Sequence, residues 1–306
     1  MSASTGIDQG TFRQLDQTTP APKKRRRARG FNSISPRETV VRYVLLLFVL
    51  LITIGPFLWQ LSTSLKGPAE DIYAKTPQFI PTDPTLNNYE RVAEAIPVMS
   101  YIGNSLIVAA LTIGGNVIGA TLAGFAFAKL KFKGRLVALS LFFVTLVLPG
   151  EATIISQFVT IKELGLADTL LGVALPGMIG MLNVLLMFNA FRGIPAEIDQ
   201  AAIMDGANVW QRIRYIGFPA VKGTLAIVVI FAFIGAWDDF LWPLIVLTNP
   251  NNFTLTLGLQ YLQGTFSNDP RLIAAGAMIA FIPLAILFAL VQRWFFKGVG
   301  EGAVKG

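Results

Sequence analysis

Long uncharged stretches alternate with short polar segments over most of this chain of 306 residues. A helix needs about 20 apolar residues to cross a bilayer, and six stretches come close to that length or exceed it. They are 43–65, a part of 95–128, 136–161, 169–191, a stretch that opens at Gly223, and 272–292. The pattern therefore predicts an all-α integral membrane protein with six transmembrane helices.

Two of these stretches contain polar or helix-breaking residues. Pro149, Gly150 and Glu151 interrupt the third stretch, and Asp238 and Asp239 lie within the fifth, with uncharged residues on both sides. The second stretch is rich in small residues and contains a G-x-x-x-G pair at 115 and 119. Such a pair predicts a close contact between helices.

The basic residues predict the orientation. With the N-terminus placed in the cytoplasm, twenty Lys and Arg residues fall on the cytoplasmic side and five fall outside. Because cytoplasmic segments carry the excess of Lys and Arg, we expect both termini to be cytoplasmic. The same orientation places the polar segment 192–222 in the cytoplasm.

Composition narrows the possible functions. The chain is 53% hydrophobic and 14% charged, with a mean hydropathy of +0.59, as expected of a membrane protein. It contains no cysteine and no histidine. Disulfides, thiolate metal sites and catalysis through a histidine base are therefore excluded. We expect no cofactor, no metal and no catalytic site, and no phosphate-binding loop of the G-x-x-x-x-G-K-[ST] type is found.

The first 37 residues are polar and include the basic run KKRRRAR at 23–29. Such a run can bind nucleic acid, but next to a membrane span we interpret it as a cytoplasmic anchor for anionic lipid. We expect residues 1–37 to form a disordered tail and 38–306 to form the transmembrane domain.

The segment between Pro195 and Pro219 is the long polar interruption in the second half of the chain. Ile198, Ala201 and Ala202 recur at helical spacing, and Gly206 is a suitable helix end. The pattern predicts two short helices joined at Gly206, with a small-residue surface that can dock into a groove of another protein. An ordinary amphipathic surface helix is the alternative.

This segment resembles the EAA loop of ABC-importer permeases, whose pattern is E-A-A, three residues, Gly, nine residues and I-x-L-P. The matching residues are Gln200, Ala201, Ala202, Gly206, Ile216, Phe218 and Pro219. Gln200 replaces the Glu of the pattern and Phe218 its Leu. The longer form D-G-A-x-x-W-Q, typical of carbohydrate importers, is present as Asp205, Gly206, Ala207, Trp210 and Gln211.

The resemblance implies the fold of an ABC-importer permease with a cytoplasmic coupling hairpin, similar to the smaller permease of maltose-type importers. It also implies a bacterial inner-membrane location and three kinds of protein partner: a second permease, two copies of an ABC ATPase and an extracytoplasmic substrate-binding protein. Membrane lipid is expected as a partner and nucleic acid is not. The residues expected to couple to the ATPase are Glu197, Asp199, Gln200, Ala201, Ala202, Asp205, Gly206, Ala207 and Pro219.

Three acidic residues lie within otherwise apolar stretches, where a charge is costly. Glu151 and Asp238 each follow the nearest cytoplasmic basic residue by 16 positions, which corresponds to about 24 Å along a helix. They and Asp239 are therefore hydrated or ion-paired at the outer interface, or they line the outer mouth of a translocation path. The motif W-[ND]-[DE]-F-x-x-P-L around Asp238 again resembles carbohydrate permeases.

Trp237 and Trp242 flank the acid pair. They fit an aromatic belt at the membrane interface, or a site where an indole stacks against a sugar ring.

The segment 249–270 is rich in amides, hydroxyls and aromatic residues and carries one charge, Asp269. It is either a solvated loop or a contact surface for a neutral ligand or a binding protein. The resemblance implies contact with the external binding protein, with Asn251, Asn252, Tyr261 and Gln263 as candidates. The C-terminal QRWFFKGVGEGAVKG also matches the ending of the family.

Three functions remain to be compared. A permease subunit of an ATP-driven importer of sugars or polyols agrees with every motif, and a permease for another solute is the alternative within the family. A secondary transporter would couple through buried ionisable groups, and a membrane enzyme would need Glu151 and Asp238 or Asp239 as its catalytic pair. Copurification with an ATPase distinguishes the first from the other two.

Overall fold

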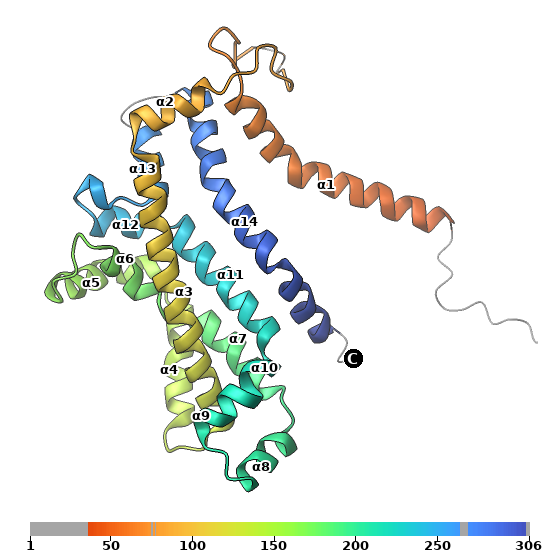
Figure 1. Ribbon diagram of the computed structural model, residues 1–306, viewed down its shortest axis with the longest axis vertical. Coiled ribbons are helices and arrows are strands. Elements are labelled where there is room, and N and C mark those ends of the chain that lie inside the picture. The colour runs from red at the N-terminus through yellow and green to blue at the C-terminus, as the bar shows by residue number, and fades with distance from the viewer. Residues whose placement is uncertain (1–35, 75, 77, 264–268, 304–306) are drawn as a thin grey trace, which may run out of the picture. The chain divides into compact units, whose positions relative to one another are not determined.

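The computed structural model describes residues 36–74, 76, 78–263 and 269–303, and describes side chains up to Arg293. These residues form helices and one isolated antiparallel bridge between Lys66 and Pro84 (Figure 1). The predicted all-α class is confirmed. The basic run and most of the predicted tail lie outside the described residues.

Contacts within the chain divide it into two units, Met1–Gly55 and Pro56–Gly306. Helix α1 (Pro36–Ser64) begins in the first unit and ends in the second. In the first unit, the large apolar side chains from Val40 to Ile52 are all exposed.

Three helices of the described residues are long and apolar enough to cross a membrane: α1, α3 (Val98–Lys129) and the Pro270–Arg293 part of α14 (Pro270–Ala303). Three bent pairs reach the same criterion together. They combine α4 (Arg135–Val147) with α5 (Gly150–Glu163), α6 (Leu170–Ala174) and η1 (Leu175–Gly177) with α7 (Met181–Arg192), and the segment Val209–Ala220 with α11 (Lys222–Asp238).

Several shorter elements lie toward the two ends of the second unit (Figure 1). Helices α2 (Asn87–Ala95) and α13 (Leu255–Tyr261) lie toward one end, whereas α12 (Leu241–Val246), which precedes η3 (Pro250–Asn252), lies nearer the middle beside α6. The opposite end carries α8 (Ala196–Met204), α9 (Val209–Gln211), the π-helix η2 (Arg212–Gly217) and α10 (Phe218–Ala220).

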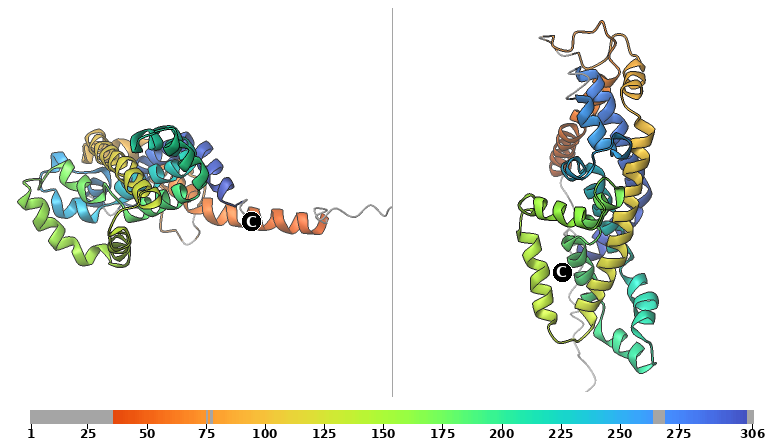
Figure 2. Two further views of the ribbon diagram at one scale, coloured as in Figure 1. Left: turned by 90° about the horizontal axis from the view of Figure 1, so that it is seen from below. Right: turned by 90° about the vertical axis from the view of Figure 1, so that its left-hand side faces the viewer.

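The third predicted span is not one helix. Helix α4 ends at Val147, and α5 leaves it at an angle of 108° (Figure 2). Pro149 explains the break, because it lacks a backbone N–H and disfavours helical geometry in the residue before it. The fifth span also ends earlier than its apolar composition suggests, since α11 stops at Asp238 and α12 begins at Leu241.

Helix α3 contacts both α7 and α11, and α11 contacts α14. The G-x-x-x-G pair of α3 lies close to the segment that leads into α7. A Cβ atom added to Gly115 would lie 2.5 Å from the Cβ of Met178, and one added to Gly119 would lie 2.7 Å from the Cγ1 of Ile179. The predicted close approach is therefore present, and its partner is the chain between η1 and α7.

The apolar core consists of two clusters. One contains Val108, Phe233, Trp237 and residues of α12 and α13, and the other contains Phe125, Phe191 and other residues from the C-terminal part of α3, from α7 and from the N-terminal part of α11. Between them, α3 carries the buried polar residues Thr112 and Asn116. A polar layer therefore separates the two clusters.

Candidate functional site

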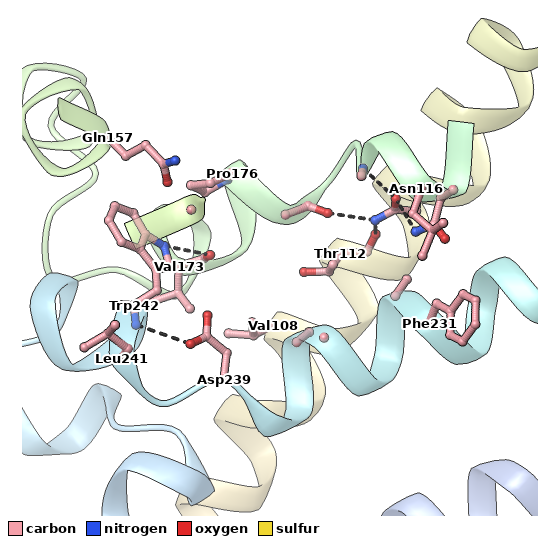
Figure 3. Close-up of a pocket in the computed structure, with 18 of the residues that line it drawn as sticks. Val108, Thr112, Asn116, Gln157, Val173, Pro176, Phe231, Asp239, Leu241 and Trp242 are labelled. Carbon is pink, nitrogen blue, oxygen red and sulfur yellow. Dashed lines mark hydrogen bonds between the residues drawn. The ribbon is translucent and has the colours of Figure 1, made fainter. Parts of the chain in front are cut away.

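A pocket of about 520 Å³ lies beside this polar layer. Its lining comes from α3, α5, α7 and α11 and from three places where a helix is broken (Figure 3). Gly150 lies at the α4–α5 bend, Gly177 and Gly180 between η1 and α7, and Asp239 between α11 and α12. Irregular backbone within a membrane is tolerated where it lines a cavity or is buried in protein.

Asn116 holds one of these breaks in place. Its amide nitrogen donates to the carbonyls of Thr112, at 2.9 Å, and Gly177, at 2.7 Å. Its amide oxygen accepts from the backbone N–H of Gly180 at 2.9 Å and from the side chain of Asn183 at 2.8 Å. All four hydrogen-bonding positions of this amide are thus used, and they connect α3 to both sides of the break.

The polar lining also includes residues that sequence reasoning missed: Thr112, Asn116, Gln157 and Asn183. The amide oxygen of Asn183 is buried and has no hydrogen-bond partner among the described residues. The signal for these residues is weak, because single amides and hydroxyls hardly change the hydropathy of an apolar stretch.

The structure separates the three predicted acids. Glu151 and Asp239 line the pocket, whereas Asp238 is exposed and is absent from the lining. Asp239 accepts the backbone N–H of Trp242 at 3.3 Å, which fixes its carboxylate at the start of α12 (Figure 3). In the described part of the chain, no ion pair involves Glu151 or Asp238.

Both tryptophans are buried, so neither fits an interfacial belt. Trp237 donates its indole N–H to the carbonyl of Ala280 at 3.0 Å and stacks on Phe233 in the core, away from the pocket. Trp242 lines the pocket, and its indole N–H donates to the carbonyls of Gly172 and Val173. Of the two, Trp242 has a position from which its ring can contact a solute.

The polar segment forms the predicted helix–Gly–helix hairpin. Helix α8 ends in a Schellman motif, in which Gly206 donates to the carbonyl of Ile203 and Ala207 donates to that of Ala202. Gly206 has φ +81°, a conformation that Gly adopts without strain. Asn208 and Gln211 then form a capping box that starts the second helix.

An ion pair joins the two helices of the hairpin. Arg212 of η2 binds Asp199 of α8 through two hydrogen bonds, of 2.9 and 2.6 Å. Their side chains are only 7% and 14% exposed, respectively. The guanidinium also lies 5.4 Å from the ring centroid of Phe125, which connects the hairpin to α3. Asp199 therefore contributes to the interior of the hairpin, and its partner Arg212 is a residue that the sequence analysis did not indicate.

The small-residue surface differs from the prediction in one respect. Ala202 is buried, whereas Ala201 and Ile198 are exposed. The predicted stripe is therefore not a continuous outer face. Of the residues predicted to couple, those exposed on the hairpin are Glu197, Gln200, Ala201, Asp205, Gly206 and Pro219, while Ala207 is half-buried.

Comparison with known proteins identifies the family. Residues 115–301 match the family described as "Binding-protein-dependent transport system inner membrane component". This chain belongs to that family. It is a transport component of the bacterial inner membrane rather than an enzyme, and its resemblance to carbohydrate-uptake ABC permeases is confirmed.

Two relatives and one solved structure show how far the similarity extends. The chain is 32% identical to the inner membrane ABC transporter permease protein YcjP of Escherichia coli over 86% of this chain and 95% of the relative. It is 30% identical to the galactooligosaccharides transport system permease protein GanQ of Bacillus subtilis, over 86% and 94%. A bacterial importer of the acidic polysaccharide alginate has the same fold, with a TM-score of 0.74 and 22% identity over 86% and 99% of the two chains.

In this permease, segment 249–263 is not a solvated loop. Leu255 and Leu257 of α13 are fully buried, and Asn104 of α3 donates to the carbonyls of Asn251 and Phe253. Asp168 accepts the backbone N–H groups of Asn249 and Thr248, and these two hydrogen bonds lower its pKa.

The candidate contacts in this segment have different positions. Asn251, Tyr261 and Gln263 are exposed, and Tyr261 stacks on Phe253. Asn252 is half-buried, and its amide donates to the carbonyl of Asp168 at 2.7 Å.

The Arg212–Asp199 pair allows a test of the hairpin structure. Arg212→Met or Asp199→Leu alone leaves one buried charge without its partner, which costs about 3 kcal/mol. We expect the double variant to unfold at a higher temperature than either single variant in detergent. Arg192→Met, which alters an exposed arginine, is the control and should have little effect. Strictly additive losses would show that the pair does not hold the hairpin together.

Proposed function

We propose that this chain is one of two permease subunits of an ATP-driven importer of neutral sugars, oligosaccharides or related polyols. The observation that carries the substrate class is the lining of the pocket between the two apolar clusters. In this proposal the chain supplies half of the translocation path, and ATP is hydrolysed on a separate subunit that docks on the α8–α9 hairpin.

The orientation supports this assembly. With six spans and both termini in the cytoplasm, the basic residues follow the distribution expected of an inner-membrane protein. The hairpin then faces the cytoplasm, where an ATPase is available. The opposite end, with Asn251 and Tyr261 exposed, faces the external binding protein.

Cysteine labelling tests the orientation, since the natural chain has no cysteine. Met204 is 87% exposed on the hairpin, and Asn251 is exposed at the other end. In intact cells expressing this chain without an ATPase, we expect an impermeant thiol reagent to label Asn251→Cys. Met204→Cys should react only after permeabilisation. Labelling of Met204→Cys in intact cells would invert the proposed topology.

The pocket suits a neutral polyhydroxylated solute. Amides and carboxylates of Asn183, Gln157, Glu151 and Asp239 can hydrogen-bond to hydroxyl groups, and the Trp242 ring offers an apolar wall. No Lys or Arg lines the pocket within the described part of the chain. This half of the path therefore offers no counter-charge to a phosphorylated or otherwise anionic solute, which disfavours the non-carbohydrate alternatives of that kind.

Asp238 and Asp239 are adjacent, but only Asp239 lines the pocket, so substituting each in turn tests the role of the pocket. Asp239→Asn keeps the oxygen that caps α12 but removes a charged acceptor from the pocket. We expect it to reduce sugar uptake on the order of tenfold, the value of one hydrogen bond to a charged group, with normal amounts of assembled complex. Asp238→Asn, which changes an acid outside the pocket, is the control. Equal effects of the two substitutions on uptake would contradict the assignment of this pocket to the path.

The substrate class is tested separately. Uptake of labelled neutral sugars, polyols and sugar phosphates is compared in cells with and without this chain. We expect the neutral compounds to depend on it, and dependence limited to the phosphorylated compounds would overturn the carbohydrate proposal.

The hairpin supports coupling to an ATPase through its shape. Ala201, Gln200 and Asp205 form an exposed surface around the Gly206 turn, and the capping box and the ion pair fix the two helices relative to each other. A rigid protrusion can transmit movement between subunits, which a flexible loop cannot. Because Asp199 and Ala202 point inward, we assign them to the stability of this protrusion and not to direct contact.

Gly206 tests the coupling. Val there is strained at φ +81°, by more than the roughly 1–2 kcal/mol that an ordinary residue loses in left-handed geometry, while an added Cβ meets no atom within 4 Å. We expect Gly206→Val to lose ATPase association or ATP-driven uptake while the protein still inserts. Gly206→Asn, which tolerates positive φ, should retain more activity. Full uptake and full ATPase association in Gly206→Val would refute the coupling role.

A further inference from the structure

A second groove, of about 560 Å³, lies between α3 and the hairpin segment that leads into α11. One wall consists of Val117, Ile118, Thr121 and Leu122 of α3 and is apolar apart from the Thr121 hydroxyl. The other contains Trp210, Arg214, Tyr215, Phe218 and Lys222. Ile118 is 63% exposed and Trp210 is 64% exposed, so the described part of the chain does not cover the groove.

In the proposed orientation, the groove extends from the membrane surface into the bilayer. Ile118 precedes Lys129, the last residue of α3, by 11 positions, which corresponds to about 16 Å along the helix. Lys222, by contrast, is the first residue of α11, at the edge where the hairpin joins the membrane span. The groove therefore combines a polar entrance with an apolar interior.

The charged residues in the described lining of the groove are both basic. Arg214 and Lys222 are exposed, and no acidic residue belongs to the described lining. The Arg214 guanidinium lies 5.9 Å from the ring centroid of Tyr215 and takes part in no ion pair among the described residues. Both cations are thus available to an anionic ligand at the polar entrance.

We propose that this groove binds one anionic phospholipid of the cytoplasmic leaflet. Its phosphate lies between Arg214 and Lys222, and one acyl chain lies along Ile118 and Leu122. Trp210 and Tyr215 occupy the interfacial depth that amphipathic aromatic side chains prefer. A lipid held here touches both α3 and the coupling hairpin, so its presence stabilises their contact.

Lipid fits this groove better than a protein partner does. A soluble ATPase cannot reach Ile118, which lies within the bilayer in the proposed orientation. A second permease would have to present an acidic group near the membrane to match the two cations, and such a group is costly there. A lipid phosphate supplies the charge at the interface, and its acyl chain supplies the apolar surface.

Lipid retention tests the proposal on the whole transport complex. The complex is purified in detergent, exposed to equal amounts of phosphatidylglycerol and phosphatidylcholine, and examined by native mass spectrometry. We expect selective retention of phosphatidylglycerol. The double substitution Arg214→Gln and Lys222→Gln should weaken this retention roughly tenfold. The charge-conserving pair Arg214→Lys and Lys222→Arg should preserve it.

The control is Lys131→Gln with Lys133→Gln, which removes two exposed charges on the same side of the membrane but outside the groove. Equal loss in the control, or equal retention of the two lipids by the natural chain, would overturn the proposal. So would unchanged lipid retention with loss of the second permease or the ATPase, because the groove would then be a protein interface. The inference uses the proposed orientation, but its readout involves no transport, so failure of the proposed substrate class leaves it unaffected.

Discussion

The four hydrogen bonds of the Asn116 amide are the interaction on which the arrangement of helices around the pocket depends. A buried amide without partners would be costly in an apolar interior. Here both donors and both acceptors are used, and the partners lie on α3 and on either side of the break before α7. The amide therefore replaces backbone hydrogen bonds that a continuous helix would have made. It keeps the break open at the level where the two apolar clusters separate.

Helix α3 connects this break to the hairpin. Asn116 and Phe125 lie on the same helix, nine positions apart, or about 14 Å along its axis. The guanidinium of Arg212 lies over the ring of Phe125 and also binds Asp199 of α8. In the proposed assembly, one helix and one buried ion pair therefore connect the hairpin to the pocket. Gly115, Gly119 and Gly124 leave no space for a side chain between α3 and the segment 178–188, so α3 cannot move far without α7.

The sequence predicted the helical class, the family and the turn at Gly206, because each depends on a local signal. Twenty apolar residues, a conspicuous motif and a glycine after a helix are all visible along the chain. The 108° bend after α4 was visible only as Pro149 and Gly150, since composition alone does not distinguish a kinked span from one that turns back. The inward position of Ala202 and the Arg212–Asp199 pair were not predictable, because they depend on how two short helices pack.

The convergence of three helix breaks explains why the pocket lies where it does. A broken helix leaves backbone N–H and C=O groups without partners, and in a bilayer these must be satisfied by protein, by water or by a solute. The breaks at Gly150, at Gly177–Gly180 and at Asp239 all border one pocket. Asn116 satisfies part of the second break, and the Asp239 carboxylate satisfies part of the third. Because the three breaks border the same pocket, the polar groups that each one leaves contribute to a single polar surface. In the proposed transport path, a solute rich in hydroxyl groups would exchange hydrogen bonds with that surface and would not need to enter the apolar clusters on either side.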